Sequence, residues 1–284
     1  MSLHFGVLAD RTAHNAYGHL VEVLRGRRLV ALTGAGISTE SGIPDYRGGG
    51  TARRARNPIQ HSQFVSDAAT RRHYWARSVV GWPRMRGAKP NDGHAALAEL
   101  ERAGVVSGVI TQNVDRLHSR AGSVGVVELH GALQEVRCLD CAAIEDRDEL
   151  QARLAALNPG WHHRDAEVAP DGDAELADIA SFEVAACVHC GGTLMPNVVF
   201  FGGSVPRPVV DSAWSLLDRA DALLVTGTSL AVFSGYRFVR KAAQRQLPIA
   251  IVNLGPTRGD DLANVRIEKP CGKCLADLAR DLLE

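Results

Sequence analysis

The chain has 284 residues, of which 45% are hydrophobic and 23% charged, a composition typical of folded soluble proteins that excludes a disordered or collagen-like chain. Its 32 Lys and Arg residues balance its 32 Asp and Glu residues, so it lacks the basic surplus typical of nucleic-acid-binding proteins. No apolar run approaches the roughly 18 residues of a membrane-spanning helix, and the N-terminus shows no signal or transit peptide pattern. We therefore expect a cytoplasmic protein of bacterial type, with neither nucleic acid nor a membrane as partner.

Segments of strand length alternate with helical segments, which is the pattern of an α/β protein with a parallel sheet. In chain order, the sequence predicts a helix at 16–25, strands at 28–32, 105–111, 124–129, 222–226 and 248–252, and a helix at 94–102 that ends at Gly104. Polar or glycine residues follow these strands. Because ligands of such sheets bind at the carboxyl ends of the strands, we expect one cleft there.

A glycine turn, Gly34-Ala35-Gly36, follows the first clear strand. Glycines at this place let the backbone approach a ligand closely, and their N–H groups can hold a pyrophosphate. The dinucleotide fingerprint of dehydrogenases needs a third glycine where Thr39 stands, and an acidic residue about 20 residues later, where Arg53 and Arg54 stand. The turn therefore favours a dinucleotide or phosphate ligand and argues against hydride transfer; a purely structural strand-to-helix connection is the alternative.

Two C-x-x-C pairs, Cys138/Cys141 and Cys187/Cys190, predict a zinc site. Two intervening residues let both thiolates of a pair reach one tetrahedral ion, and four thiolates close its coordination shell, so the zinc would be structural. The segment 142–186 between the pairs is longer than in the usual zinc ribbon, and Cys271/Cys274 have the same spacing. Disulfides and ordinary buried thiols are the alternatives.

Five motifs resemble, in order, the signatures of the sirtuin family. They are Gly34–Arg47, Thr111–Asp115, Leu129–Gly131, Gly227–Leu230 and Asn253–Gly255, and the resemblance covers the chain from about Gly26 to Leu278. It implies an α/β fold in which a Rossmann-like parallel sheet carries a smaller inserted zinc-binding lobe. It also implies an NAD-dependent protein lysine deacylase that consumes NAD as a co-substrate.

The resemblance further implies roles for individual residues. His130 would be the general base, with Asn113 as the second catalytic residue. The acyl oxygen of a modified lysine attacks the nicotinamide ribose, nicotinamide leaves, and His130 deprotonates a ribose hydroxyl that takes the acyl group to give O-acyl-ADP-ribose. Residues implied to bind NAD are Gly34, Ala35, Gly36, Ser38, Asp45, Tyr46, Arg47, Gln112, Asn113, Val114, Asp115, Gly227, Thr228, Ser229, Asn253, Leu254, Gly255 and Cys271. The zinc ligands would be Cys138, Cys141, Cys187 and Cys190, and Cys274 is left without a role.

Tyr74 and Arg77 bear on which acyl group is removed. Three residues apart on a helix, their side chains share one face and can bind a carboxylate together. Sirtuins that remove acidic acyl groups have Tyr-x-x-Arg at this place, and this motif, with Gly81-Trp82-Pro83 and residues 169–173, resembles class II of the family. The resemblance implies a dicarboxylic acyl group in preference to acetyl. The alternative is a core tyrosine beside a solvent-exposed arginine.

The segment Val198, Val199, Phe200, Phe201 and Gly202 resembles the one that pairs with the substrate peptide as an added strand. Nearby, Gly203 and Ser234 depart from the family, in which an acidic residue and a proline are frequent at these two positions.

Taken together, the sequence predicts one sirtuin catalytic domain over residues 1–284. Its Rossmann-like lobe comprises residues 1–47, 91–136 and 195–284, with a helical insertion at 48–90 and a zinc lobe at 137–194. The expected partner is an acylated lysine on a protein or peptide, and the expected state is a monomer. Protein mono-ADP-ribosyl transfer and a non-catalytic NAD or ADP-ribose sensor are the competing hypotheses; His130 argues against the sensor, which needs no base.

Overall fold

The computed structural model describes residues 16–45, 58–161 and 179–284. Tyr46, Arg47, the Arg53/Arg54 pair and residues 169–173 lie outside these ranges. Within them, helical residues 16–24 agree with the predicted N-terminal helix. None of the helices in the described ranges has the length and apolar character needed to cross a bilayer.

A six-stranded parallel sheet forms the larger lobe, with strand order β3-β2-β1-β7-β8-β9. The strands are β1 (Leu29–Thr33), β2 (Val106–Thr111), β3 (Val126–Glu128), β7 (Ala222–Thr226), β8 (Ile249–Val252) and β9 (Val265–Ile267). The first five were predicted, and β9 was not. Since β1 lies between β2 and β7, the strand order reverses at β1, and the carboxyl ends of these three strands border the expected ligand crevice.

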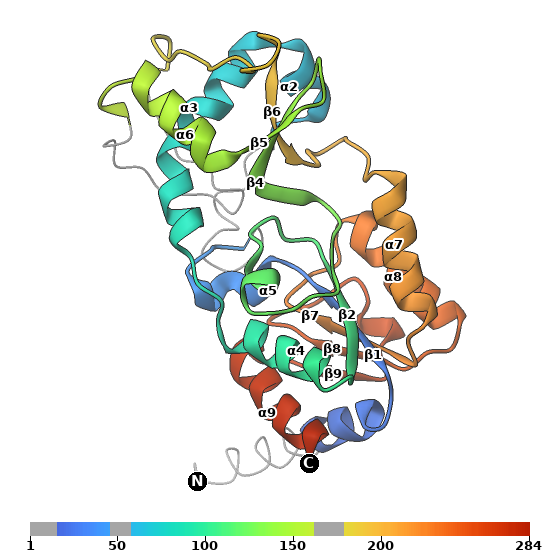
Figure 1. Ribbon diagram of the computed structural model, residues 1–284. Coiled ribbons are helices and arrows are strands. Elements are labelled where there is room, and N and C mark those ends of the chain that lie inside the picture. Colours follow the sequence, from blue (N-terminus) through green and yellow to red (C-terminus); the bar gives the residue numbers. More distant parts are fainter. Residues whose placement is uncertain (1–15, 46–57, 162–178) are drawn as a thin grey trace, which may run out of the picture.

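Helices cover both faces of this sheet because its strands are apolar on both sides (Figure 1). Residues 16–24, α4 (Asp92–Arg102) and α9 (Cys271–Leu283) pack on the face that carries Leu29 and Ala31. On the other face, α7 (Arg207–Asp218) and α8 (Phe233–Gln244) pack against Val30 and Leu32. Helix α4 begins two residues earlier than predicted because the Asn91 side chain caps it, accepting from the backbone N–H of Gly93 (3.0 Å).

The smaller lobe contains an antiparallel sheet of order β5-β4-β6, at the top of Figure 1. Its strands are β4 (Gly131–Cys138), β5 (Ile144–Asp146) and β6 (Leu194–Val198), and its helices are α2 (His61–Ser66), α3 (Ala68–Gly87) and α6 (Arg147–Leu157). One core joins Phe64 and Trp75 from the helical segment to Leu154, Phe182 and Met195. The predicted parallel sheet with a smaller inserted lobe is thus confirmed.

Helix α3 connects the lobes. Its C-terminal part places Trp82 and Met85 in a cluster with Ile43 and with Leu117 of the short helix α5 (Leu117–Arg120). Val114 and Val198 pack against the same cluster, so the loop after β2 and the end of β6 meet beside α3.

Candidate active site and zinc centre

The turns that follow β1 and β7 are in direct contact. The N–H of Gly36 donates to the Gly227 carbonyl oxygen (2.8 Å), and a Cβ on Gly36 would lie 2.8 Å from that same oxygen. Gly227 has a φ of 64°, and a Cβ there would overlap the nitrogen of Ile37. Glycine is therefore required at both positions because the two backbones approach closely. The Gly36 N–H was expected to face a phosphate, but it donates to the protein's own backbone. Ala35 and Ser229 are half-buried beside these turns.

A buried hydrogen-bond network holds Ser38, Asn113 and Asp115 together. Ser38 lies on the 3-10 helix η1 (Ala35–Ser41), and its Oγ donates to Asp115 Oδ2 (2.7 Å). The same Oγ accepts from Asn113 Nδ2 (3.1 Å) and lies 3.4 Å from His94 Nε2. Three of the predicted NAD-binding side chains thus meet at the carboxyl ends of β1 and β2. Burial raises the pKa of Asp115, while the N–H of Leu117 and the Ser38 hydroxyl offset part of this effect.

Two buried histidines, which the sequence did not predict as site residues, support this network through hydrogen bonds. His94, on α4, reaches Ser38, and the fully buried His118 lies with Nε2 2.9 Å from Thr33 Oγ1. Thr33 donates to Thr111 Oγ1 (2.8 Å), which accepts the backbone N–H of Asn113 (3.1 Å). Asn113 is therefore held from two sides. Burial lowers the pKa of His94 to about 4, and burial together with His94 lowers that of His118 to about 3.

These two pKa values predict a loss of stability in acid. Both histidines are neutral when folded but titrate near 6.5 when unfolded, so their contribution is complete above pH 6.5 and falls as the pH drops toward 4. At pH 5 the loss is about 2 kcal/mol per histidine. Thermal unfolding at pH 7 and pH 5 measures it: the drop in Tm should be smaller in His94→Gln than in wild type. The exposed His19→Gln should match wild type, and equal drops in all three proteins would contradict the prediction.

His130 lies in the turn between β3 and β4, and both nitrogens of its ring have a hydrogen-bond partner. Nδ1 lies 2.9 Å from the Gln112 carbonyl oxygen, and Nε2 lies 2.8 Å from Ser234 Oγ. A carbonyl only accepts, so Nδ1 carries the hydrogen and Nε2 the lone pair in the neutral ring. Burial lowers the pKa of His130; the hydrogen bond to the Gln112 carbonyl offsets part of this, and the charge of Arg237 lowers the pKa further. The ring is therefore neutral at pH 7 and can accept a proton at Nε2.

The turn after β8 contains three more of the predicted NAD-binding residues. Asn253 Nδ2 donates to the carbonyl oxygens of Leu254 (2.9 Å) and Gly255 (3.1 Å), which fixes the turn. Leu254 is 62% exposed. Cys271, the first residue of α9, lies buried beside this strand end with Sγ 3.8 Å from the Val252 carbonyl oxygen. Burial raises the pKa of its thiol to about 11, so it is an apolar wall and not a nucleophile.

The predicted peptide-binding segment, 198–202, lies next to His130. The N–H of Val199 donates to the His130 carbonyl oxygen (2.8 Å), and Val198 pairs with Gly131. Phe201 is 41% exposed, and its carbonyl oxygen accepts from His61 N (2.8 Å). Gly202 has a φ of 75°, which bends the chain at the end of the segment. The segment is therefore hydrogen-bonded to the turn that carries the base.

Tyr74 and Arg77 lie on α3, as predicted. Tyr74 is buried, and its ring packs edge-on against Phe64 (5.4 Å between centroids) and Phe200 (5.5 Å). Arg77 is half-buried. The aromatic contact with Phe200 places the Tyr-x-x-Arg motif beside the predicted peptide segment.

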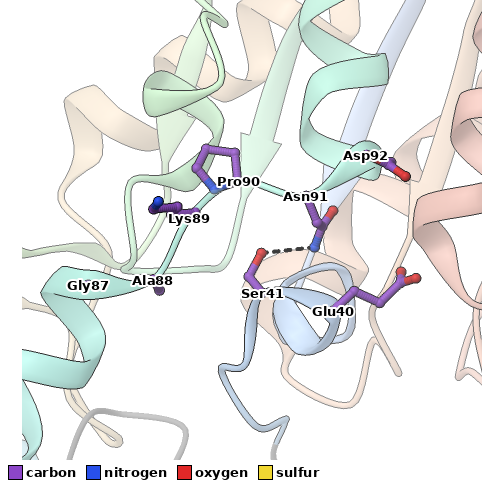
Figure 2. A pocket seen from close by; sticks show the side chains of 8 residues that line it. All are labelled: Glu40, Ser41, Gly87, Ala88, Lys89, Pro90, Asn91 and Asp92. Carbon is purple, nitrogen blue, oxygen red and sulfur yellow. Dashed lines mark hydrogen bonds between the residues drawn. The ribbon is translucent and has the colours of Figure 1, made fainter.

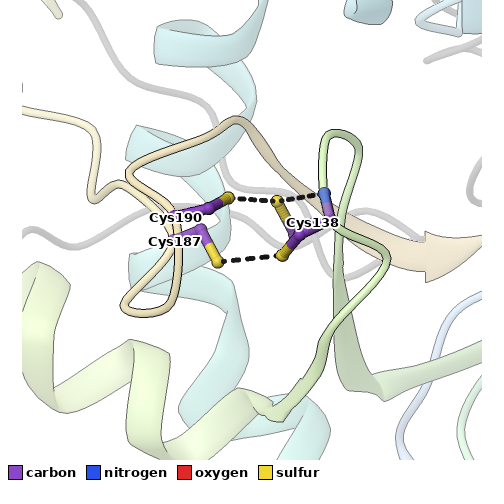
Figure 3. Close-up of side chains that lie close together, drawn as sticks. Cys138, Cys187 and Cys190 are labelled. Atoms are coloured by element: carbon purple, nitrogen blue, oxygen red, sulfur yellow. Dashed lines mark hydrogen bonds between the residues drawn. The ribbon is translucent and has the colours of Figure 1, made fainter.

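The four predicted zinc ligands converge. Cys138 Sγ lies 3.5 Å from Cys190 Sγ, Cys141 Sγ lies 3.8 Å from Cys187 Sγ, and all four sulfurs are within 4.8 Å of one another (Figure 3). Zn–S bonds of about 2.3 Å in a tetrahedron separate the sulfurs by about 3.8 Å, so the cluster fits one zinc ion. The N–H groups of Asp140 and Cys141 point at Cys138 Sγ (3.4 and 3.5 Å). These bonds, that of Cys141 first, lower the pKa of Cys138 to about 7 and favour the thiolate that zinc requires.

A separate pocket of about 570 Å³ lies between η1 and the α3–α4 connection, lined by Glu40, Ser41 and residues 87–92 (Figure 2). Asn91 Nδ2 donates across it to Ser41 Oγ (3.0 Å) and also to the Ile37 carbonyl oxygen (2.7 Å). None of its lining residues was predicted to bind a ligand. Asp45, which was, is half-buried at the end of the described range 16–45.

Comparison with known proteins identifies the family of this chain. The Sir2 family model matches residues 34–234. NAD-dependent protein deacetylase 1 of Mycobacterium avium is 54% identical over 268 residues, which cover 93% of this chain and 94% of that protein. The mitochondrial NAD-dependent protein lipoamidase sirtuin-4 of Bos taurus is 50% identical over 254 residues, 88% of this chain and 81% of that protein. A solved Sir2–p53 peptide–NAD+ complex has a TM-score of 0.73 and 31% identity, covering 94% of this chain and 95% of the other. The predicted resemblance is confirmed, and the chain belongs to the Sir2 family.

Proposed function

We propose that this protein is an NAD-dependent protein lysine deacylase that releases nicotinamide, the deacylated lysine and O-acyl-ADP-ribose. The observation that carries the proposal is His130, which is neutral, presents a basic Nε2 and lies beside the buried Asn113–Asp115 network. A module that only binds NAD needs no such base. The NAD-dependent activity named for the relatives agrees with this reading.

The residues at the carboxyl ends of the strands fit NAD. Asn113 and Asp115 are 8% and 4% exposed, and keeping an amide and a carboxylate buried at a crevice is costly unless they serve a ligand or a network. When bound, NAD supplies the ribose carbon that loses nicotinamide and accepts the acyl oxygen. The protein's part is to hold Asn113 and Asp115 through Ser38, and to take a proton from a hydroxyl at His130 Nε2.

We infer that the chain acts as a single catalytic domain and as a monomer in the bacterial cytoplasm, with acylated lysine on proteins or peptides as its partner. The shared cluster of Trp82, Met85, Ile43 and Leu117 supports one domain, because it joins α3 to the larger lobe.

The test is incubation of the purified protein with NAD and peptides that carry acetyl-, lipoyl- or succinyl-lysine, with nicotinamide and deacylated peptide measured separately. A deacylase forms the two products in equal amounts and only when NAD and an acyl peptide are both present. Nicotinamide release with ADP-ribose attached to protein would favour mono-ADP-ribosyl transfer. Tight NAD binding without any product would favour the sensor.

We further infer that an acidic acyl group is preferred, with Tyr74 and Arg77 holding its carboxylate beside Phe200. Arg77→Met should lower kcat/KM for a succinyl peptide by about 10- to 100-fold, the effect of losing one charged hydrogen bond. The value for an acetyl peptide should stay within about twofold because acetyl presents no carboxylate to the guanidinium. Arg72→Met, an exposed arginine of the same helix, is the matched control. Equal losses on both peptides would contradict a carboxylate-binding role.

A further inference from the structure

The basic nitrogen of His130 has a partner within the protein. Ser234 Oγ lies 2.8 Å from Nε2, and Nδ1 is already occupied by the Gln112 carbonyl. Because Nε2 of the neutral ring has a lone pair and no hydrogen, the hydroxyl of Ser234 must be the donor. The hydrogen bond therefore falls on the atom that accepts the proton in the proposed reaction.

Ser234 is free for this contact because of its place on α8. It is the second residue of the helix, and its hydroxyl points from the first turn to His130 Nε2 (2.8 Å). The backbone carbonyl oxygen of Ser234 accepts from Nε of Arg237 (3.0 Å), which lies one turn further along α8. This bond connects the first turn of the helix to the next.

The start of α8 is also held against the group that orients Nδ1. A Cβ on Gly235 would lie 2.7 Å from the Gln112 side chain, so this glycine allows the helix to pack directly on Gln112. Gln112 Oε1 in turn accepts from Thr228 Oγ1 (2.8 Å). Gln112 and Ser234, the two partners of the His130 ring, thus belong to one packed unit.

We propose that Ser234 is a positioning residue for the general base: its hydroxyl fixes the His130 ring and stabilises the form with an unprotonated Nε2. The proposal rests on the proposed deacylase function. It assigns a role to a position where the family frequently has proline, which has no hydroxyl to donate.

The hydrogen bond from Ser234 sets the direction of the effect, and the nearby charged groups are Arg237 on α8 and two carboxylates that already have partners. On α8, Arg237 disfavours a charged ring. On the strand side, the Glu128 carboxylate faces Arg116 (3.6 Å), and the Asp115 carboxylate accepts from Ser38. Since a hydrogen bond to the neutral form disfavours protonation, removing the Ser234 hydroxyl should raise the pKa of His130. The acid limb of the pH–rate profile should then move to higher pH.

The experiment compares Ser234→Ala, Ser234→Thr and wild type. Ser234→Ala should lower kcat at pH 7 by about five- to tenfold, the scale of one neutral hydrogen bond, with the KM for NAD within about twofold. Its acid limb should shift upward, and Ser234→Thr, which keeps a hydroxyl, should restore most of both. Ser215→Ala, which removes an exposed hydroxyl on α7, is the matched control and should behave as wild type.

An NMR titration of the His130 ring gives a readout that does not depend on turnover. A higher pKa in Ser234→Ala than in wild type and Ser234→Thr supports the proposal, even if the deacylase assignment were to fail in the product assay. An unchanged titration overturns it. Equal losses of kcat in Ser234→Ala and Ser234→Thr also overturn it, because they would indicate a packing effect.

Discussion

Removal of zinc is expected to unfold the smaller lobe while the six-stranded sheet persists. The four sulfurs join the end of β4 to the loop before β6, two segments about 50 residues apart, and zinc–thiolate sites contribute on the order of 10 kcal/mol. Against this, the described part of the lobe packs its small three-stranded sheet and its helices around a single apolar cluster. Metal analysis should find one zinc per chain, and a strong chelator should change the fluorescence of Trp75 and Trp161, which are buried in that cluster.

Cys138→Ser should reproduce the effect of the chelator. Cys274→Ser is the matched control: Cys274 is buried in α9, far along the chain from the cluster, so zinc content should stay at one per chain. Zinc loss in both variants, or an unchanged tryptophan signal after complete zinc removal, would contradict a structural zinc in this lobe.

His130→Ala is expected to lower kcat for deacylation by about 100- to 10,000-fold, the usual contribution of a general base. The affinity for NAD should change little, because the side-chain hydrogen bonds of His130 go to Gln112 and Ser234 and not to the Asn113–Asp115 network. Steady-state kinetics with the preferred acyl peptide and calorimetric NAD titration measure the two effects separately.

His19→Ala, which truncates an exposed histidine in residues 16–24, controls for the substitution itself and should leave both quantities unchanged. A loss of kcat below about tenfold in His130→Ala would mean that another group takes the proton. A parallel loss of NAD affinity would indicate that His130 supports the binding site as a whole.

Residues that meet from distant parts of the chain escaped the sequence argument. His118 contacts Thr33 across 85 positions, and Ser234 contacts His130 across 104 positions. Neither histidine nor serine carries a local pattern that separates a site residue from a surface or core one. Ser234 was noticed only as a departure from the family, and its hydroxyl acquires a role because α8 begins beside the base.

The glycine turn after β1 was predicted correctly, but the structure gives a different reason for its glycines. Gly34 and Gly36 were expected to leave N–H groups open to a phosphate, yet Gly36 donates to Gly227 on the neighbouring turn. The glycines are needed because two backbone turns touch, and this contact follows from β1 and β7 being neighbours in the sheet.

The sequence by itself determined five of the six strands of the parallel sheet, the cysteine pairs and the family motifs. Each of these depends on residues a few positions apart, whose periodicity or spacing is dictated by the geometry of a strand, a helix or a metal ion. Only the tertiary structure decided which histidines are buried, which nitrogen of His130 is basic and what Ser234 does. The burial and the hydrogen-bond partners of these side chains depend on segments that the strand order brings together. No local sequence pattern predicts that order.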